Sequence, residues 1–494
     1  MSSIINTFSA LFSVTPDKVS FISAQFIIIF ILLYSVFAFT HSNKSFRNGL
    51  LTFFSLYLYY RLSGPGIFFL VFITASDFLL AKLISRSNNE NAKLRYLLVS
   101  IVVDISILAY FKYTNFFLSQ YSYAVNPGST FIPLAIIAPI GISYFVFKSM
   151  GYVLDVHRGM IENPEENFLT YLLYNSFFPT IVAGPIARAR EVIPQFNSTP
   201  VISEKMVTRG LVLILSGVIK KVFIADFIST QFLDKMFESP SYFSGFEGFI
   251  TLYAVPIQIF CDFSGYTDIA IGLSLLLGIE IKNNFNKPFS AKSITDFWRR
   301  WHITLLDWFN EYIFMPLNFS LRRWRKLSTF ISIMTVFLIS GMWHGAAWTF
   351  IIWGVLHGLM LVFEIIFGLN NSAEPKKFRY LTVIWALVSF HFIALTFVIF
   401  KSPNLYTAQI IFSKIFAGFN FEIIERWFSI YYLTFIIILC GYVIHFLSSN
   451  VKTQLLDNFH RLNWATKAIV ITFILYIVYQ FSAAESKPFI YLEF

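Results

Sequence analysis

Long apolar stretches, each close to the length of a membrane-crossing helix, constrain this chain more than any other feature. A helix needs about 20 apolar residues to cross the hydrocarbon core of a bilayer. The clearest stretches are Phe21–Phe39, Ile67–Ile84, Leu97–Leu118, Val212–Phe227, Leu381–Phe400, Tyr432–Leu447 and Ala468–Phe481. Only 13% of the 494 residues are charged, whereas soluble domains carry about 25%. The sequence therefore predicts an all-α polytopic membrane protein with about 10–12 transmembrane helices.

The middle of the chain differs from its flanks because its apolar stretches are interrupted. The interrupted or weaker stretches are Leu50–Tyr60, Phe131–Met150, Gly248–Cys261, Thr267–Ile279 and Thr329–Gly368. In "AGPIARAR", Gly184 and Pro185 break a helix just before two arginines, which indicates either a re-entrant turn or an anion-facing loop. Irregular backbone at membrane depth is tolerated only where it is buried in protein or lines a watery cavity. We therefore expect re-entrant segments around a cavity, within a single membrane-embedded unit that covers residues 1–494.

The net charge of +10 is concentrated in short connections such as Lys220/Lys221 and Arg322/Arg323/Arg325/Lys326. This pattern is typical of cytoplasmic loops that contact anionic lipid, and it could also steer an anionic cytoplasmic donor. Nucleic-acid binding is not indicated. The N-terminus lacks the pattern of a cleaved signal peptide, so we expect the first apolar stretch to anchor the chain. Cys261 and Cys440 cannot form a disulfide framework, and no metal-binding spacing is present.

The segment "DFWRRWHITL", Asp296–Leu305, places charged residues among tryptophans. Read as a helix, it brings one set of residues to a common face, namely Trp298, Trp301, His302 and Leu305. Asp296 and Arg300 are four residues apart and can form an ion pair. The tryptophans alone would suit an anchor at the membrane interface. An anchor has no need of an imidazole, so His302 is a candidate functional residue.

His344 lies in "GMWHG" within an apolar region, where ionisable residues are costly and often functional. An imidazole is the usual general base near neutral pH, although a histidine hydrogen-bonded across helices is the structural alternative. We assign such a structural role to His357. Asp262 needs a partner, for which the arginine pair is a candidate, and it can equally form a structural ion pair. Tyr266 lies one helical turn after Asp262.

Several motifs in order resemble those of the membrane-bound O-acyltransferase family, most of all its bacterial polysaccharide branch, typified by the alginate O-acetyltransferase membrane subunit. They are "CDFSGYTDIAIGL", "NNFNKPFSAKSITDFWRRWHITLLDWFNEYIFMPL" and "GMWHGAAWTFIIWGVLHG". "FFPTIVAGPIARAREVIPQF" and the closing "KPFIYLEF" agree with this branch. The resemblance is most specific from about residue 144 to residue 358.

This resemblance implies a ring of helices around a central tunnel. It also implies that His344 is the central catalytic residue, acting as general base or acyl carrier, and that His302 is the second active-site residue. Trp298, Trp301 and Trp343 would narrow the tunnel, and Asp262 and Tyr266 would lie along it. Arg299 and Arg300 would hold phosphates or brace Asp262.

The implied activity is transfer of acetyl groups from cytosolic acetyl-CoA, with no bound cofactor, for O-acetylation of a cell-wall or secreted polysaccharide. The implied location is the bacterial cytoplasmic (inner) membrane, with membrane lipids around the chain. A separate extracytoplasmic acetyltransferase of the SGNH type is the implied partner. Two alternatives stay open. One is an acyltransferase of the same fold that moves D-alanine or a lipid acyl chain, since "NNFNKPF" is similar to the D-alanine branch. The other is a non-enzymatic transporter, which broken helices also suit.

Overall fold

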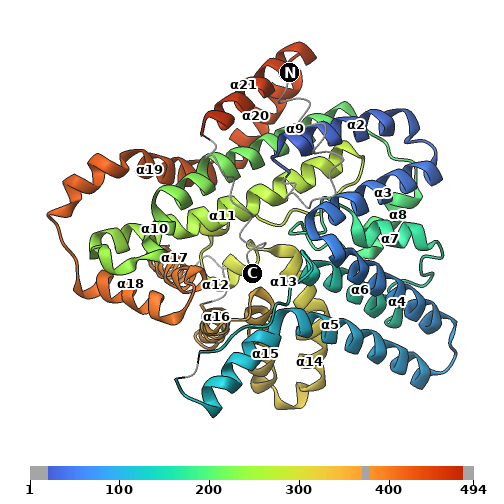
Figure 1. Ribbon diagram of the computed structural model, residues 1–494, viewed down its shortest axis with the longest axis horizontal. Helices are drawn as coiled ribbons and strands as arrows, with labels where there is room; N and C mark the ends of the chain where they lie inside the picture. The colour runs from blue at the N-terminus through green and yellow to red at the C-terminus, as the bar shows by residue number, and fades with distance from the viewer. Residues whose placement is uncertain (1–20, 129, 370–378, 482–494) are drawn as a thin grey trace. The chain divides into compact units, whose positions relative to one another are not determined.

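The computed structural model describes residues 21–128, 130–369 and 379–481, and these ranges contain helices, turns and loops but no strand (Figure 1). The predicted all-α class is therefore confirmed. The chain divides into two compact units, one formed by Met1–Leu211 and Ile269–Lys282 and the other by Val212–Asp268 and Asn283–Phe494. The closing motif "KPFIYLEF" lies outside the described residues. The expectation of a single membrane-embedded unit stays a prediction.

The first unit is built from helices joined by connections of different length. Its helices are α2 (Ala24–Thr40), α3 (Lys44–Ser63), α4 (Ile67–Arg86), α5 (Glu90–Val125), α6 (Ile142–His157), α7 (Phe168–Ser176) and α8 (Ala189–Asn197). Helices α2 to α5 follow one another through short turns, whereas longer connections precede α6, α7 and α8. Asn43 and Asn89 cap α3 and α5 with their side chains, which supplies acceptors to backbone N–H groups that a helix start leaves without partners. Helix α4 packs against α5, α6 and α7 and thus lies at the centre of this unit.

The predicted apolar span Phe131–Met150 is wrong in its first half. The backbone is not helical before Ile142, where α6 begins. Pro133 and Pro139 lack the N–H that a helix interior needs. Gly141 has a φ of +72°, and a Cβ at this position would lie 2.4 Å from the carbonyl oxygen of Ile181. The turn into α6 therefore requires glycine.

An irregular segment at residues 177–188 is buried along its whole length. Fully buried Lys148 holds its start, because its ammonium group donates to the carbonyl oxygens of Tyr174 (2.6 Å) and Asn175 (3.2 Å) at the C-terminal end of α7. A cation is favourable at this end of a helix. Beyond the segment, Arg190 pairs with Asp155 at 3.2 Å. These contacts fit a buried turn better than an anion-facing loop, and they satisfy the rule that irregular backbone must be buried.

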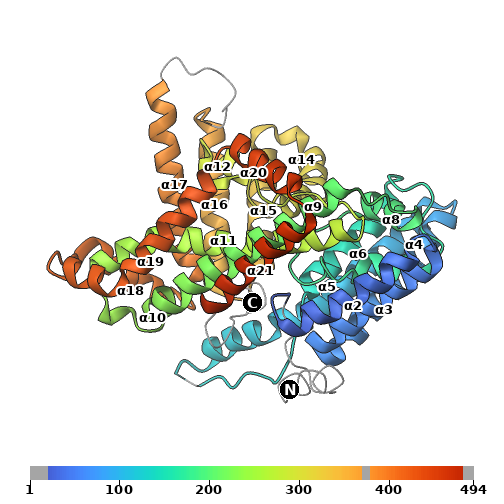
Figure 2. The same cartoon turned by 90° about the horizontal axis from the view of Figure 1, so that it is seen from above.

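The second unit contains most of the motif-bearing residues. Its helices are α10 (Asp234–Glu238), α12 (Ile294–Trp298), α13 (Ile303–Phe309), α14 (Met315–Ser320), α15 (Lys326–His344), α16 (Trp348–Ile366), α17 (Arg379–Lys401), α18 (Leu405–Ala417), α19 (Ile423–Phe446), α20 (Ser449–Arg461) and α21 (Trp464–Phe481), with the π-helical segments η2 (Ile219–Asp226), η3 (Ser229–Leu233) and η6 (Asn310–Phe314). Helices α9 (Glu204–Val218) and α11 (Gly245–Leu276) contribute residues to both units. Helix α16 packs against both α15 and α17, and Figure 2 shows α16 and α17 side by side.

The predicted span Gly248–Cys261 and most of the span Thr267–Ile279 lie in one 32-residue helix, α11, which ends at Leu276. The polar residues between them do not break the helix because Asp262 has an ion-pair partner on η2. The clear apolar stretch Val212–Phe227 also differs from expectation, since α9 gives way to the π-helical segment η2 at Ile219. π-Helical turns are rare and are frequent at functional sites.

Seven helical stretches are long and apolar enough to cross a membrane within the described ranges, which confirms a polytopic membrane protein. They are Lys44–Arg86, Glu90–Val125, Gly245–Leu276, Lys326–His344, Trp348–Ile366, Tyr380–Lys401 and Ile423–Phe446. The first contains both α3 and α4, which separate at Gly64. Shorter apolar helices lie at Gln25–Thr40, Leu405–Ala417 and Trp464–Val478. The total number of crossings, the ring and the tunnel stay predictions.

The predicted stretch Thr329–Gly368 forms a helical hairpin, α15 and α16, whose backbones come into close contact. A Cβ at Gly354 would lie 2.3 Å from the carbonyl oxygen of Phe337, and one at Gly341 would lie 2.5 Å from that of Phe350. Small residues permit such close packing of membrane helices. Gly354 and Gly358 lie one helical turn apart on α16, and a Cβ at Gly358 would lie 2.9 Å from the sulfur of Met334.

Replacing Gly354 by alanine should lower the free energy of unfolding by about 1–3 kcal/mol, because the added methyl group forces two helix backbones apart. The matched control is Gly49→Ala on α3, where a Cβ meets nothing within 4 Å. That control should raise stability slightly, since alanine is the better helix former. Unfolding in detergent measures both, and equal effects at the two positions would contradict the close approach.

Candidate active site

His302 and His344 line one small cavity in the second unit. We call it the narrow cavity, and its lining residues are Trp298, Trp301, His302, Leu305, Leu306, Phe309, Val336, Phe337, Ser340 and His344. Its volume is about 10 Å³, which is room for about one water molecule. Both histidines are buried, with 1% and 4% of their surfaces exposed. The structure thus brings together the two histidines that the sequence singles out.

His302 lies at a break between two short helices, so the prediction of one continuous helix through this segment is wrong. Helix α12 ends at Trp298 and α13 begins at Ile303. His302 has a φ of +45°, in the left-handed region that L residues rarely adopt. Strain of this kind persists where neighbouring contacts hold it, often at functional sites. Nevertheless, Trp298, Trp301, His302 and Leu305 all line the narrow cavity, as their spacing predicts.

Asn284 determines which nitrogen of His302 carries the hydrogen. The side-chain oxygen of Asn284 accepts from the backbone N–H of Thr304 (3.1 Å) and from its hydroxyl (2.9 Å). The same oxygen lies 3.2 Å from Nδ1 of His302. Because an amide oxygen only accepts hydrogen bonds, Nδ1 carries the hydrogen and Nε2 is the basic nitrogen.

Burial lowers the pKa of His302 to about 3, whereas an exposed histidine has a pKa of about 6.5. Between these values the unfolded chain takes up a proton that the folded protein does not, so stability falls as the pH falls below about 6.5. We expect the wild type to lose roughly 2 kcal/mol more than a His302→Gln variant between pH 8 and pH 5. Detergent-phase unfolding curves at both pH values measure this, and parallel losses in the two proteins would contradict it.

His344 ends α15 and is surrounded by aromatic rings. Its ring lies 5.1 Å from each of the rings of Trp343, Trp353 and Phe400, in edge-to-face geometry. Trp343 also lies 5.9 Å from the ring of His302. It therefore contacts both histidines although it does not line the narrow cavity. This aromatic surround excludes water from the imidazole, which strengthens any electrostatic interaction made there.

A second and larger cavity adjoins the first. We call it the wide cavity, and its lining residues are Thr295, Trp298, Arg299, Ile303, Leu306, Asp307, Asn310, Phe314, Ile333, Val336, Phe337, Leu361 and Ile365. Its volume is about 490 Å³, within the range of about 300–1,000 Å³ for small-molecule sites. The two cavities share Trp298, Leu306, Val336 and Phe337. An apolar chain with one polar or anionic end fits such a lining, with Arg299 as its cationic contact.

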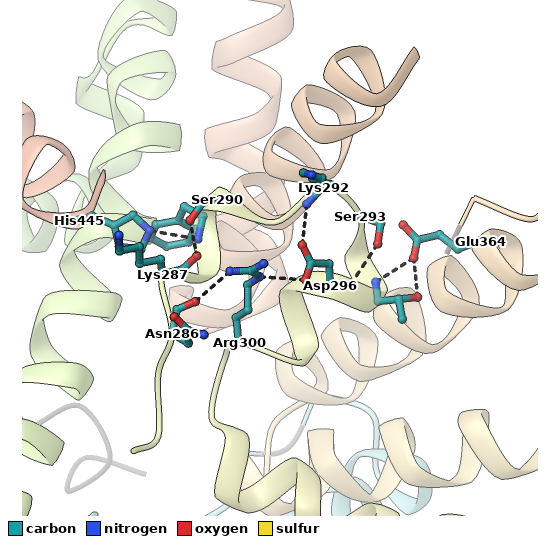
Figure 3. A network of polar contacts seen from close by, with 11 residues as sticks. Asn286, Lys287, Ser290, Lys292, Ser293, Asp296, Arg300, Glu364 and His445 are labelled. Carbon is teal, nitrogen blue, oxygen red and sulfur yellow. Dashed lines mark hydrogen bonds and ion pairs between the residues drawn. The ribbon is translucent and has the colours of Figure 1, made fainter. Parts of the chain in front are cut away.

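The short helix α12 carries Trp298 and is held in place by a buried carboxylate. Glu364 on α16 accepts from the backbone N–H groups of Ile294 (2.6 Å) and Thr295 (2.8 Å) and from the indole N–H of Trp385 on α17 (2.9 Å). A carboxylate is favourable at the start of a helix. Glu364 is fully buried, and Figure 3 shows it beside Ser293 at the start of α12.

The predicted ion pair between Asp296 and Arg300 is confirmed at 2.8 Å. Asp296 also accepts from the backbone N–H of Lys292 at 3.0 Å, and Figure 3 shows the carboxylate between these two partners. Arg300 lines neither cavity, unlike Arg299. Arg300 thus ties the turn that leads to His302 back to α12.

His357 contacts Trp298, which lines both cavities, but does not itself line them. Its Nδ1 accepts from the indole N–H of Trp298 at 3.3 Å, and its Nε2 therefore donates to the hydroxyl of Thr396 at 3.0 Å. The hydroxyl of Thr396 in turn donates to the carbonyl oxygen of Ile393. The contacts of His357 match the structural role that the sequence indicates, with the added consequence that they orient Trp298.

Asp262 does not pair with the arginines of the motif, so that expectation is wrong. Its carboxylate lies 2.5 Å from the ammonium group of Lys221, which also contacts Asp226 at 2.8 Å. Lys220 pairs with Asp268 at 2.6 Å. Lys221 is buried inside the fold and therefore does not face lipid. Asp262 and Tyr266 are both buried on α11, and neither lines a cavity. Helix α11 contacts the site through Phe263 instead, because the ring of Phe263 lies 4.7 Å from that of His302.

Two residues that position the site, Asn284 and Glu364, are absent from the sequence-based expectations. Glu364 carried a usable signal, because an isolated carboxylate in an apolar run such as "LMLVFEIIFG" calls for a partner. Asn284 carried none, since an asparagine in a polar connection is usual in turns.

The family model described as "MBOAT, membrane-bound O-acyltransferase family" matches residues 3–403 of this chain. The match includes both histidines and all residues that line the two cavities.

Individual relatives come from several bacteria. A protein of Azotobacter vinelandii named "Probable alginate O-acetylase" is 37% identical over 329 residues, 65% of this chain and 63% of the relative. A "Peptidoglycan O-acetyltransferase" of Helicobacter pylori is 33% identical over 82% of this chain and 80% of the relative. A "Teichoic acid D-alanyltransferase" of Bacillus subtilis is 31% identical over 54% of this chain and 70% of the relative. The matched part of this chain thus spans less than two thirds of the alginate relative.

Proposed function

Because this chain belongs to the membrane-bound O-acyltransferase family, we propose that it is an enzyme that transfers acyl groups to hydroxyl groups. The group transferred is acetyl, and the end product is an O-acetylated cell-wall or secreted polysaccharide. The enzyme works in the bacterial cytoplasmic membrane.

One observation carries this proposal: two buried histidines line a cavity that shares its wall with a cavity of ligand size. In the proposed arrangement, the wide cavity takes the thioester arm of acetyl-CoA, with Arg299 facing the anionic part of the donor. The acetyl group enters between Trp298 and Phe337 and reaches the narrow cavity. The two cavities together would then form the tunnel of the family.

The proposed chemistry requires a base and a dry environment. The acceptor oxygen forms a bond to the acetyl carbon while the bond between that carbon and sulfur breaks. His344 takes the proton of the acceptor hydroxyl and returns it to the departing thiolate, or it carries the acetyl group on its ring between two such steps. His302 stays neutral, and its Nε2, which accepts hydrogen bonds, orients the hydroxyl group of the acceptor. Exclusion of water protects the thioester from hydrolysis.

The choice of acetyl rests on two relatives, the probable alginate O-acetylase and the peptidoglycan O-acetyltransferase. The match to the peptidoglycan relative covers 82% of this chain, whereas the match to the alginate relative covers 65%. A D-alanyl donor is the second candidate, supported by the shorter match to the teichoic acid enzyme. The acetyl group then passes to a separate extracytoplasmic protein of the SGNH type, which completes transfer to the polymer.

The test supplies sealed inverted vesicles containing the protein with labelled acetyl-CoA and, separately, with a labelled D-alanyl thioester. We expect label to appear on an acceptor at the vesicle interior only with acetyl-CoA. Transfer of label from the D-alanyl donor alone would show that the enzyme transfers D-alanine rather than acetyl. Passage of polymer across the vesicle without any thioester, and no transfer of label, would identify a transporter instead.

A further inference from the structure

Three lysines from separate segments of the second unit gather around one half-buried region, which we call the lysine cluster: Lys220 on η2, Lys287 before the short turn Pro288–Ser290, and Lys452 on α20. The ammonium group of Lys287 lies 3.5 Å from the hydroxyl of Ser449, which lies one helical turn before Lys452. Lys220 lies over the ring of Phe260 at 5.6 Å. These contacts bring residues that are more than 60 positions apart into one neighbourhood.

His445 on α19 contacts residues beside the lysines of the cluster, namely Phe289 near Lys287 and Phe260 near Lys220. Its Nε2 accepts from the backbone N–H of Phe289, two residues after Lys287, at 3.2 Å. Its ring lies 4.7 Å from that of Phe260, the same ring that Lys220 covers. The charges of all three lysines act on it. Figure 3 shows His445 and Lys287 at one side of the polar network.

The lysine cluster carries more positive than negative charge. Asp268 is the carboxylate that pairs with Lys220, at 2.6 Å, while no ion pair of Lys287 or Lys452 occurs among the described residues. Partial desolvation, followed by the charges of Lys220 and Lys287, lowers the pKa of Lys452. Like charges in one neighbourhood repel one another, and a bound anion would relieve this repulsion.

Two features of the backbone add to this imbalance. Helix α20 directs its N-terminal end toward Lys287, through Ser449, and a helix N-terminus attracts anions. Lys287 itself has a φ of +46°, a rare left-handed conformation for a residue other than glycine. The hydroxyl and the N–H of Ser290 both donate to its carbonyl oxygen and hold it there. Such strain is often retained where a side chain must be presented to a ligand.

We propose that the lysine cluster is a binding site for a phosphate group. Three ammonium groups and a serine hydroxyl match the oxygens of a phosphate ester. The phosphate can belong to a nucleotide in solution or to the headgroup of an anionic phospholipid. This site shares no residue with either cavity and does not depend on the proposed acetyl transfer.

Footprinting of the wild-type protein tests the proposal in two arms. The full chain is placed in nanodiscs of phosphatidylcholine with adenosine 3′,5′-bisphosphate, or in nanodiscs that contain phosphatidylglycerol without nucleotide. Acylation of each lysine by an amine-reactive reagent is then followed by mass spectrometry. We expect Lys287 and Lys452 to be protected in at least one arm, which identifies the source of the phosphate, whereas Lys414 on α18 stays reactive. No protection in either arm, or equal protection of Lys414, would overturn the proposal.

Variants give a second and independent readout. Lys287→Gln combined with Lys452→Gln should weaken binding of the protecting phosphate roughly ten-fold or more. The matched arginine pair, Lys287→Arg with Lys452→Arg, should retain it. Lys414→Gln is the control for charge alone, and an equal loss there would show a nonspecific effect. Because binding rather than transfer is measured, failure here leaves the proposed enzyme function untouched.

Discussion

Replacing His344 by alanine should lower the rate of acetyl transfer by about 10²–10⁴-fold, the contribution of a well-placed general base. The same substitution removes an acyl carrier if the histidine acts in that way, so either role predicts the loss. Membranes with equal amounts of folded protein, supplied with labelled acetyl-CoA, provide the measurement.

The control for this prediction is His41→Ala, which removes a partly exposed histidine of the first unit. It should leave the rate unchanged. Full activity of the His344 variant would remove this residue from the mechanism. Loss of activity in both variants would indicate a general effect on the fold.

Replacing Lys221 by methionine should lower the free energy of unfolding by about 3–5 kcal/mol. Lys221 is 1% exposed and contacts the carboxylates of Asp262 and Asp226 at 2.5 Å and 2.8 Å. Methionine has a similar length but no charge, so the two buried carboxylates would lose the ammonium group that they share. The concentration of denaturing detergent at the unfolding midpoint measures the effect.

An exposed ion pair offers the matched comparison. Lys282 pairs with Glu191 at 2.6 Å, with 57% and 34% of their side chains exposed. Lys282→Met should therefore cost less than about 1 kcal/mol, because water screens the pair. Similar losses for the two substitutions would show that burial does not govern these interactions. A Lys221→Met protein that gains stability when Asp262 is also replaced by leucine would support the proposed cause.

Features set by local spacing could be predicted from the sequence. The pairing of Asp296 with Arg300 follows from their separation of four residues, and it holds although the helix ends at Trp298. The apolar length of α15 and α16 and the close approach at Gly354 follow from composition and small-residue spacing. That His302 and His344 line one cavity follows from the family motifs that contain them, and not from the number of residues between them.

Features set by distant partners could not be predicted in this way. Asp262 pairs with Lys221, 41 residues away, and no local pattern distinguishes that lysine from the nearer arginines. The break at His302 depends on Asn284, 18 residues before it. The backbone carbonyl oxygen and the side-chain oxygen of Asn284 accept from the backbone N–H groups of Ile303 and Thr304, which a continuous helix would have bonded internally. Helix α12 depends in the same way on Glu364, 70 residues from Ile294. In each case tertiary hydrogen bonds outweigh local helix propensity.

The most direct test of the account is a structure of the protein with a stable thioether analogue of acetyl-CoA bound. The account predicts the pantetheine arm in the wide cavity beside Arg299. The acetyl group should then lie past Trp298 and Phe337 in the narrow cavity, in contact with the imidazole of His344. An analogue bound elsewhere, or a His344 side chain that faces hydrocarbon with no cavity beside it, would contradict the account.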